Sequence, residues 1–378
     1  MANIIAGSVP IGPQGGSGED PVLVLRLIRS RRVGPATFHR LIAENGSVEG
    51  ALRALPDIAR QAGMTDYEPC PLGVVRAEMA AGRRAGARLL TWFDDAYPAE
   101  LREISDAPAV LWMRGNLRVL DSDKIAVIGA RNASSLGLRM ARSLAAGLGA
   151  AGITTVAGLA RGIDSAAHEA TLTTGTIAVM ASGIDIIYPQ ENTRLADAIC
   201  ENGAVLTEQP PGMSPIARHF PARNRIVSAL SRAVVVVEAA ERSGTLLTAK
   251  NALDQGREVM AVPGHPFDGR ASGCNNLIRD GATLVRTAAD VLTALNAAPV
   301  IEAASEAPEV IAVPDDSEQR RGDQIRQRIL EKLNVAPTEE NSLIRELGLP
   351  PAAIAPSILS LELSGEIQRM PGGYLARH

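Results

Sequence analysis

Cysteine, aromatic side chains and long apolar runs are all scarce in this chain of 378 residues. The three cysteines, Cys70, Cys200 and Cys274, lie far apart without CxxC spacing, so we expect neither a disulfide framework nor a metal site. The first residues lack a basic signal-peptide region, and no apolar run approaches the roughly 18 residues of a membrane span. We therefore expect a cytoplasmic protein with no membrane partner.

Charge of one sign does not dominate either. The formal net charge is −4 at pH 7, which by itself disfavours a polyanionic partner. However, the acidic excess is concentrated in residues 300–378, where Asp and Glu outnumber Lys and Arg. A local basic patch elsewhere on the chain is therefore compatible with the composition.

The length exceeds the roughly 250–300 residues at which single cores stop growing, so we expect several domains. Residues 1–19 are rich in Gly, Pro and Ser and predict a disordered tail. Residues 20–86 have a helical pattern, and residues 87–297 alternate strands with helices. Residues 298–320 are rich in Ala, Pro and acidic residues and predict a linker. Residues 321–378 follow a pattern of three helices and a hairpin, which is typical of a winged helix.

The N-terminal helices contain Gly34 and Pro35 between two amphipathic segments, the layout of a helix–hairpin–helix. Such a hairpin can offer backbone N–H groups to phosphates. A small helical bundle with solvated arginines explains the same pattern. Both interpretations predict a small helical domain.

The central region predicts an α/β fold with an extended Rossmann-like, doubly wound, mostly parallel sheet. Its apolar runs do not alternate with polar residues, which indicates strands that are buried on both faces. The expected strands are 124–130, 153–158, 176–181, 204–208, 233–239 and 258–264. Ligands of such sheets bind beyond the carboxyl ends of the strands, where the strand order reverses.

The first strand end, "IGARNASSLG", combines features of an anion site. Gly129 lets the backbone approach a ligand, and Arg131 supplies a fork suited to phosphate. Ser134 or Ser135 is a candidate cap of a helix whose first turn would present free N–H groups. An ordinary tight turn explains this stretch equally well when it is taken alone.

Small residues, amides and cations recur at later strand ends, and packing alone does not explain this recurrence. The residues concerned are Gly158 and Arg161 after the second strand, Gly183 after the third, Lys250 after the fifth and Asn275 after the sixth. We therefore predict a groove that binds a polyanion along this edge of the sheet.

Dinucleotides and nucleoside triphosphates fit the sequence poorly. "GARNASSLG" is not GxGxxG, the second strand ends without an acidic residue for a ribose, and no GxxxxGK[ST] occurs. The candidates for hydrolytic chemistry are Asp164, His168, Glu208 and Glu238, without a legible pairing of nucleophile and base. No cofactor is expected.

The stretch "ARHFPARNRIVSALSR" is unusual because it places Phe220 among Arg218, Arg223 and Arg225 in a chain with only 3% aromatic residues. An aromatic face can stack on an unpaired base, while arginines bind phosphates. We therefore predict that Phe220 is a stacking platform for single-stranded DNA. The alternative is that Phe220 anchors this segment on the sheet.

These motifs in order, "IGARNAS", "AGLARGIDSAAHEATL", "GIDIIYPQEN", "FPARNRIVSALS", "ERSGTLLTAKNAL" and "SGCNNLIRDGA", resemble the DNA-processing protein A family, also called DprA or Smf. The resemblance spans about residues 95–297. It implies a DNA contact at Arg131, Phe220, Arg223, Asn224 and the loop at Gly158, and less securely at Lys250 and Asn275.

The resemblance also implies a function. Members of this family bind single-stranded DNA, protect incoming strands in natural transformation and help to load the RecA recombinase. Single-stranded DNA, RecA and single-strand-binding protein are therefore the expected partners, and a homodimer is the expected assembly. We expect no enzymatic activity.

The alternative function is that of a nucleotide phosphoribohydrolase, an enzyme with a related core and a PGGxGTxxE signature. The nearest stretch here is "RSGTLLTAK", in which Lys250 stands in the region of the catalytic carboxylate. A cation at this place favours binding an anion over cleaving a glycosidic bond.

Overall fold

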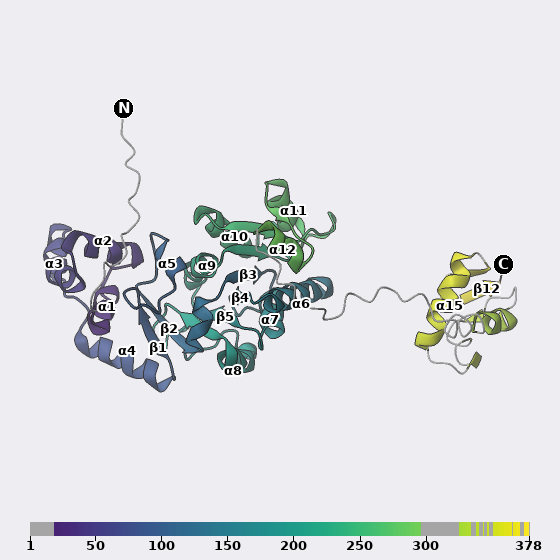
Figure 1. Cartoon of the computed structure of the whole chain (residues 1–378), viewed down its shortest axis with the longest axis horizontal. Helices are drawn as coiled ribbons and strands as arrows, with labels where there is room; N and C mark the ends of the chain where they lie inside the picture. Colours follow the sequence, from purple (N-terminus) through teal and green to yellow (C-terminus); the bar gives the residue numbers. More distant parts are fainter. Residues whose placement is uncertain are drawn as a thin grey trace, which may run out of the picture. The chain divides into compact units, whose positions relative to one another are not determined.

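The computed structural model describes residues 19–295 and, nearer the C-terminus, residues 325–333, 338–339, 343, 346–347, 351–364, 366–370 and 374–377. The chain divides into two compact units, Met1–Val300 and Ile301–His378 (Figure 1). The expected linker at 298–320, and the expected tail at 1–19 except for Glu19, lie outside the described residues.

The first unit is built on a sheet of nine strands in the order β1-β2-β6-β5-β4-β3-β7-β8-β9. All pairs from β6 to β9 in this order are parallel, whereas β1–β2 and β2–β6 are antiparallel. The strands are β1 (Arg88–Thr91), β2 (Val110–Gly115), β3 (Lys124–Ile128), β4 (Thr154–Ala157), β5 (Thr176–Val179), β6 (Ala204–Thr207), β7 (Ala233–Val236), β8 (Glu258–Ala261) and β9 (Thr283–Leu284). The six expected strands and the doubly wound fold are confirmed, and β1, β2 and β9 extend the sheet beyond the expectation.

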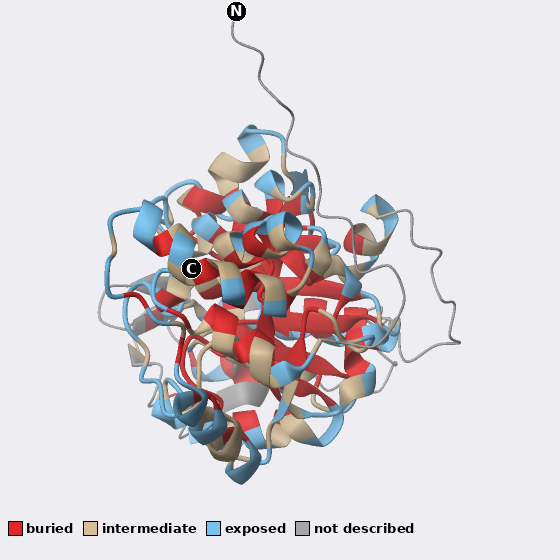
Figure 2. Ribbon diagram, turned by 90° about the vertical axis from the view of Figure 1, so that its left-hand side faces the viewer, coloured by how far each residue is buried: buried red, intermediate tan, exposed pale blue. Residues whose placement is uncertain are grey.

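Helices cover both faces of this sheet, and its central strands β3, β4, β5, β6 and β7 are buried at every position. Ile125 and Val127 of β3 face the cluster formed with α6 and α7, whereas Ala126 and Ile128 face the cluster formed with α9 and α10. Figure 2 shows these strands buried in the interior, with exposed residues on the outer helices. The helices are α5 (Ala99–Arg102), α6 (Ser135–Ala150), α7 (Ile163–Ala170), α8 (Thr193–Asn202), α9 (His219–Ala229), α10 (Thr245–Asp254), α11 (Ser272–Arg279) and α12 (Ala288–Ala294), with 3₁₀ turns η1 (Leu117–Asp121) and η2 (Gln190–Asn192).

Four helices precede the sheet: α1 (Pro21–Ile28), α2 (Pro35–Asn45), α3 (Val48–Gln61) and α4 (Leu72–Arg84). Pro35 is the first residue of α2, where its missing N–H costs nothing. These helices share a hydrophobic cluster with the sheet. Trp112 of β2 donates a hydrogen bond of 3.0 Å from Nε1 to Glu78 of α4, and Glu78 also pairs with Arg29 of α1. The helical segment therefore packs on the sheet through apolar side chains and through the hydrogen bond and ion pair of Glu78.

The second unit contains helical residues 325–332, α15 (Pro351–Leu363) and a sheet of β10 (Thr338–Glu339), β11 (Ile367–Met370) and β12 (Tyr374–Arg377). Strands β11 and β12 form the expected antiparallel hairpin. Ile354, Ile358 and Leu361 of α15 are buried in a separate small core. This arrangement agrees with the expected winged helix.

Among the described residues, no helix is both long enough and apolar enough to cross a membrane.

Candidate nucleic-acid interface

The sheet reverses its strand order between β3 and β7, because β4 follows β3 on one side and β7 lies on the other. The carboxyl ends of these parallel strands are the place where such folds bind ligands. Arg131 follows β3, Gly158 follows β4, Tyr188 follows β5 and Arg242 follows β7. These residues therefore meet along one edge of the sheet, although they are far apart in the chain.

Two neighbouring cavities lie at this edge, with volumes of about 1350 Å³ and about 630 Å³. Both are lined by Arg131, Asn132, Ala160, Phe220 and Arg223. We call the combined depression the rim groove. The larger cavity extends toward Tyr188 and η2, and the smaller one extends toward Arg242, Thr248 and Arg270.

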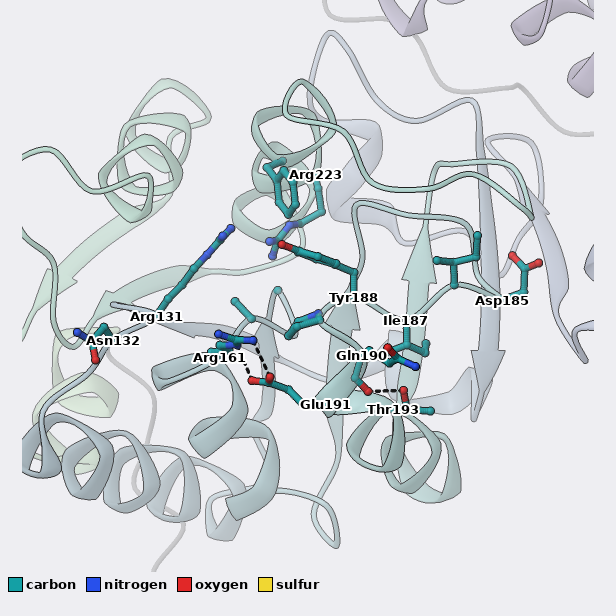
Figure 3. Close-up of a pocket in the computed structure, with 15 residues that line it drawn as sticks. Arg131, Asn132, Arg161, Asp185, Ile187, Tyr188, Gln190, Glu191, Thr193 and Arg223 are labelled. Atoms are coloured by element: carbon teal, nitrogen blue, oxygen red, sulfur yellow. Dashed lines mark hydrogen bonds and ion pairs between the residues drawn. The ribbon is translucent and has the colours of Figure 1, made fainter.

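The centre of the rim groove is a cluster of rings and guanidinium groups. The Arg131 guanidinium carbon lies 5.2 Å from the centroid of the Phe220 ring, within the range of a cation–π contact. The Tyr188 ring meets Phe220 edge-on, with centroids 5.8 Å apart and an interplanar angle of 64°. Figure 3 shows Arg131, Tyr188 and Arg223 directed toward the same space. The cluster offers aromatic surface and positive charge side by side.

Arg223 belongs to α9, lines both cavities of the rim groove and is buried. Its guanidinium fills the place where a side chain at residue 158 would project, so only Gly158 fits beside it. Burial lowers the pKa of Arg223, the carboxylate of Asp164 partly restores it, and Arg131 lowers it further. Within the described part of the chain, the Nε atom of Arg223 has no hydrogen-bond partner. Arg223 therefore adds buried positive charge to the floor of the groove.

Asp164 holds the loop between β4 and α7 in shape. Its Oδ2 accepts hydrogen bonds from the backbone N–H of Gly158 at 2.9 Å and of Ala160 at 3.4 Å. Burial raises the pKa of Asp164, and Arg223 and these backbone hydrogen bonds oppose that rise. The Asp164 carboxylate thus positions Gly158, whose lack of a side chain leaves room for the Arg223 guanidinium.

Arg161 also lines the larger cavity, where it forms an ion pair with Glu191. Its Nε lies 2.5 Å from Oε1, and its Nη2 lies 2.7 Å from Oε2 (Figure 3). Both side chains are more than half exposed, so the pair contributes little to stability and can open without a large cost.

The helix start at α6 differs from the expectation. Ser134 caps α6 by accepting a hydrogen bond from the Gly137 N–H at 2.9 Å. However, Glu238, at the end of β7, accepts hydrogen bonds from both the hydroxyl and the backbone N–H of Ser134. The hydroxyl of Ser134 is therefore engaged on both sides, Ser134 lines neither cavity, and its contact with DNA stays a prediction. The anion at this helix start is a carboxylate of the protein itself.

The arginines around Phe220 do not act as one cluster. Residues 219–229 are helical, and Pro221 is tolerated because it falls in the first turn. A step of about 100° per residue puts Arg223 and Asn224 on the same side as Phe220 and turns Arg225 away. Arg225 instead forms ion pairs with Glu208 at 2.8 Å and Asp106 at 3.2 Å. Arg225 is thus a largely buried structural cation that lines neither cavity, and its contact with DNA stays a prediction.

The remaining predicted residues lie outside the rim groove. Arg218 is exposed at the N-cap of α9, and Lys250 is exposed on α10, but neither lines a cavity. Gly183 is buried, and its N–H donates a hydrogen bond of 2.8 Å to Met213 O, so it closes a turn. The Asn275 side chain bonds the N–H and the carbonyl of Gly264. The groove thus contains Gly129, Arg131, Gly158, Arg161, Phe220, Arg223 and Asn224 of the predicted residues.

Gly129 itself serves packing more than ligand approach. A methyl group there would lie 2.5 Å from Cγ1 of Ile163, so the glycine lets α7 approach the end of β3. Sequence reasoning missed Asn132, Tyr188, Arg242 and Arg270 of the lining residues. Only Tyr188 left a legible signal, as one of four tyrosines in a chain poor in aromatics, in the segment that connects β5 to η2.

The candidates for hydrolytic chemistry are all engaged elsewhere. Asp164 accepts from backbone N–H groups, Glu208 pairs with Arg225, and Glu238 accepts from Ser134. The Nδ1 atom of His168 lies 2.7 Å from Oγ1 of Thr176, and burial lowers the pKa of His168 to about 3. In the described part of the chain, no group of three or more His, Cys, Asp or Glu is placed to hold a metal ion.

Comparisons with known proteins point to one family. Residues 88–296 match the model of the DNA recombination-mediator protein A family. Residues 19–81 match a DprA-like N-terminal HHH domain, and residues 313–373 match a DprA winged helix domain. The described folds of both flanking segments agree with these matches.

Curated relatives and solved structures agree with the family models. The chain is 47% identical over 201 residues to DNA processing protein DprA of Streptococcus pneumoniae, covering 53% of this chain and 71% of the relative. It is 38% identical over 289 residues to protein Smf of Escherichia coli, covering 74% of each.

Two solved structures are also similar. The crystal structure of the Streptococcus pneumoniae protein has a TM-score of 0.64 at 36% identity, and the match covers 73% of this chain and 98% of the other. A structure described as showing the single-stranded DNA binding mode of DNA processing protein A from Helicobacter pylori has a TM-score of 0.52 at 28% identity, covering 56% and 97%. On its sequence and on its fold, the chain belongs to the DNA recombination-mediator protein A family, whose members include DprA and Smf.

Proposed function

We propose that the rim groove binds single-stranded DNA without sequence preference and that the protein has no enzymatic activity. The observation that carries the proposal is the contact between Arg131, Phe220 and Tyr188 at the switch point of the sheet. Stacking on a ring requires a base that is free of its partner strand, and each such base contributes about 1–3 kcal/mol. Arg131, Arg223, Arg242 and Arg270 supply positive charge along the same edge.

The absence of catalysis is supported by the surroundings of the carboxylates and of His168. Each has its main polar contact inside the protein, and of the four only Asp164 lines the groove, where its carboxylate accepts from backbone N–H groups. A general base must be within hydrogen-bond reach of a substrate proton. The proposal is further supported by the Helicobacter pylori relative, which is described as binding single-stranded DNA.

The proposed partners follow from family membership. The protein would protect single-stranded DNA in transformation and recombination and would load RecA on strands covered by single-strand-binding protein, acting as a homodimer in the cytoplasm. A RecA ATPase assay on covered strands tests this part: the chain should shorten the lag before hydrolysis. An unchanged lag at saturating protein would remove RecA loading from the proposal.

A salt titration with single- and double-stranded oligonucleotides tests the binding itself. We expect tighter binding to the single strand and an affinity that falls steeply with salt, because phosphate contacts release counterions. Equal affinity for duplex and single strand would contradict the stacking role of the groove.

Phe220 is the residue that separates stacking from charge. Phe220→Ala should cost about 1–3 kcal/mol of binding, whereas Phe220→Trp, which keeps a ring, should retain most of the affinity. Phe220→Leu controls for the packing of this half-buried side chain against Tyr188. If the leucine variant binds as tightly as the original protein, Phe220 is an anchor and not a stacking platform.

The competing function is hydrolysis of nucleoside monophosphates. Incubation of the protein with each monophosphate should release no free base. Release above the level of a heat-inactivated sample would replace the proposal with a phosphoribohydrolase activity.

A further inference from the structure

Phe267 is an aromatic side chain that the groove does not use. It lies in the loop between β8 and α11, and 95% of its surface is exposed. Phe38, by comparison, is fully buried, and Phe93 is partly buried against the core. The His265 ring lies beside Phe267, with centroids 5.6 Å apart and an interplanar angle of 40°. An exposed ring costs hydration free energy in the free protein and leaves the Phe267 side chain available to a planar partner.

The loop that carries Phe267 is held by several hydrogen bonds. At its base, the Asn275 side chain accepts from Gly264 N–H at 3.1 Å and donates to Gly264 O at 3.0 Å. Near its tip, Arg270 and Asp268 are paired through two hydrogen bonds of 3.1 Å. The Phe267 ring is therefore displayed from a loop with a defined base, and Asn275 positions this loop.

The loop borders the rim groove. Strand β8 pairs with β7, which pairs with β3, so the loop after β8 emerges at the same edge of the sheet as Arg131. Arg270 lines the smaller cavity together with Phe220 and Arg242. Phe267 stands three residues before Arg270 in the chain. A strand of DNA that leaves Phe220 through this cavity thus passes arginines and then arrives at the Phe267 loop.

We infer that Phe267, with His265 beside it, is a second stacking platform for single-stranded DNA, at the far end of a path that begins at Phe220. This inference rests on the proposed function. It concerns only strands that are long enough to span both rings. The phosphates between the two platforms would lie against Arg242 and Arg270. The exposed pair of Arg270 with Asp268 is weak enough in water to yield to a phosphate.

A protein partner is the competing explanation for the exposed ring. Stable protein interfaces bury about 1,200–2,000 Å² and have an apolar centre. The residues flanking Phe267 in its loop are instead small, polar or charged, namely Gly264, His265, Pro266, Asp268, Gly269 and Arg270. A single exposed ring near Arg270, without further large apolar side chains in its loop, suits an unpaired base better than an apolar protein surface.

Oligothymidylates of about 5 and about 15 nucleotides test the inference, since known single-strand sites cover about 4–16 nucleotides. Phe267→Ala should weaken binding of the longer oligomer about fivefold or more and leave the shorter one within about twofold. Phe220→Ala should weaken both. Phe267→Trp should retain the affinity for the longer oligomer, and its indole fluorescence should be quenched on binding, since Trp92 and Trp112 are buried. Leu253→Ala, at another exposed apolar residue, is the control and should change neither affinity.

The outcomes separate the inference from the proposed function. If the unaltered protein binds both oligomers and Phe267→Ala binds them equally well, the second platform is refuted and the groove stands. An equal loss at both lengths also refutes it, because Phe267 would then belong to the primary site. A variant with normal DNA affinity but an altered mass in solution would show that the ring contacts protein. If the unaltered protein binds neither oligomer, the proposed function fails as well.

Discussion

Arg131 and Arg225 were both predicted to bind DNA, and they lie in opposite surroundings. Arg131 is exposed and contacts the Phe220 ring, whereas Arg225 is nearly buried between Glu208 and Asp106. Exposed cations are free to release counterions with a polyanion, while buried ones compensate buried carboxylates. The position on the helix or loop, and not the residue type, decides which role an arginine has.

Arg131→Ala should weaken binding to all single-stranded sequences alike and reduce the slope of log affinity against log salt by about 1. Its stability should be unchanged. Arg225→Ala is the matched variant: it should lower the free energy of unfolding by about 3–5 kcal/mol, because Glu208 stays buried without a counterion, and leave the salt slope unchanged. Titration at several salt concentrations and urea unfolding measure the two effects. A changed salt slope for Arg225→Ala, together with a loss of stability but no change of slope for Arg131→Ala, would show that Arg225 binds DNA and that Arg131 stabilises the fold.

His168 makes the fold sensitive to acid. Burial, aided by the charge of Arg223, lowers its pKa from 6.5 to about 3, so the folded protein binds fewer protons there than the unfolded chain below pH 6.5. The contribution of neutral His168 is complete above pH 6.5 and is lost as the pH falls toward 3. At pH 5 the loss amounts to about 2 kcal/mol relative to pH 8.

His168→Asn isolates this effect, since it keeps a polar atom near Thr176 and does not titrate. The difference in free energy of unfolding between the protein and this variant should shrink by about 2 kcal/mol from pH 8 to pH 5. Chemical denaturation at both pH values measures it. A difference that is constant across this range would mean that His168 is protonated equally in both states.

At the scale of elements, α4 shows how the helical segment is attached to the sheet. Gly82 lies against the ring of Trp112, where a methyl group would overlap the indole, whereas Gly73 in the same helix has open space around it. The Glu78 carboxylate between them accepts from Trp112 Nε1. Helix α4 therefore packs so closely against Trp112 of β2 that residue 82 has no room for a side chain.

Gly82→Ala should destabilise the protein by about 1–3 kcal/mol through overpacking. Gly73→Ala, in the same helix and without strain, should be neutral or stabilise by up to about 1 kcal/mol. Thermal unfolding of the two variants compares them directly. Equal melting temperatures would indicate that α4 can shift away from Trp112 at little cost.

Helix α9 shows a second effect at this scale. Taken as an irregular, Pro-broken segment, "HFPARNR" groups every arginine around Phe220. As a helix, it directs Phe220 and Arg223 to the groove and Arg225 to the far side. The regular step of the backbone thus sorts a charged run into a binding face and a structural face.

At the scale of the whole molecule, acidic and basic residues are distributed unevenly along the chain. The acidic excess lies in residues 300–320, whereas the winged-helix segment 321–378 has equal numbers of acidic and basic residues. Within it, Pro351–Leu363 contains Glu362 as its only charged residue and no Lys or Arg. A helix that reads the major groove depends on basic side chains for most of its affinity. We therefore interpret this unit as a protein-interaction or regulatory module and not as a DNA reader.

Deleting residues 300–378 should leave the affinity for single-stranded DNA within about threefold, or about 0.7 kcal/mol. The first unit has its own clusters of buried residues and ends at Val300, so the truncated chain retains its core. Binding assays on both lengths of chain measure the effect. A tenfold or greater loss in the folded, truncated protein would show that the winged helix binds DNA.

The sequence alone determined the α/β class, the six central strands and the winged helix. Each depends on local periodicity: uninterrupted β-branched runs at 233–239 predict a strand buried on both faces, and Gly372 and Gly373 predict a hairpin. It also identified Arg131, Phe220 and Arg223, because strand ends and a rare ring are visible in the chain. Strands β1, β2 and β9 escaped: β9 has only two residues, and β1 and β2 are separated by the four-residue helix α5 and so stand outside the regular alternation of strands and helices.

Only the tertiary structure decided which of the predicted residues share the groove. Glu238 and Ser134 are 104 residues apart in the chain, and their contact engages the hydroxyl of Ser134, which lines neither cavity. Gly158 has its role only because Arg223 occupies the space beside it. Such pairings arise when the sheet brings strand ends together, and a sequence pattern records the ends but not the neighbour that each one meets.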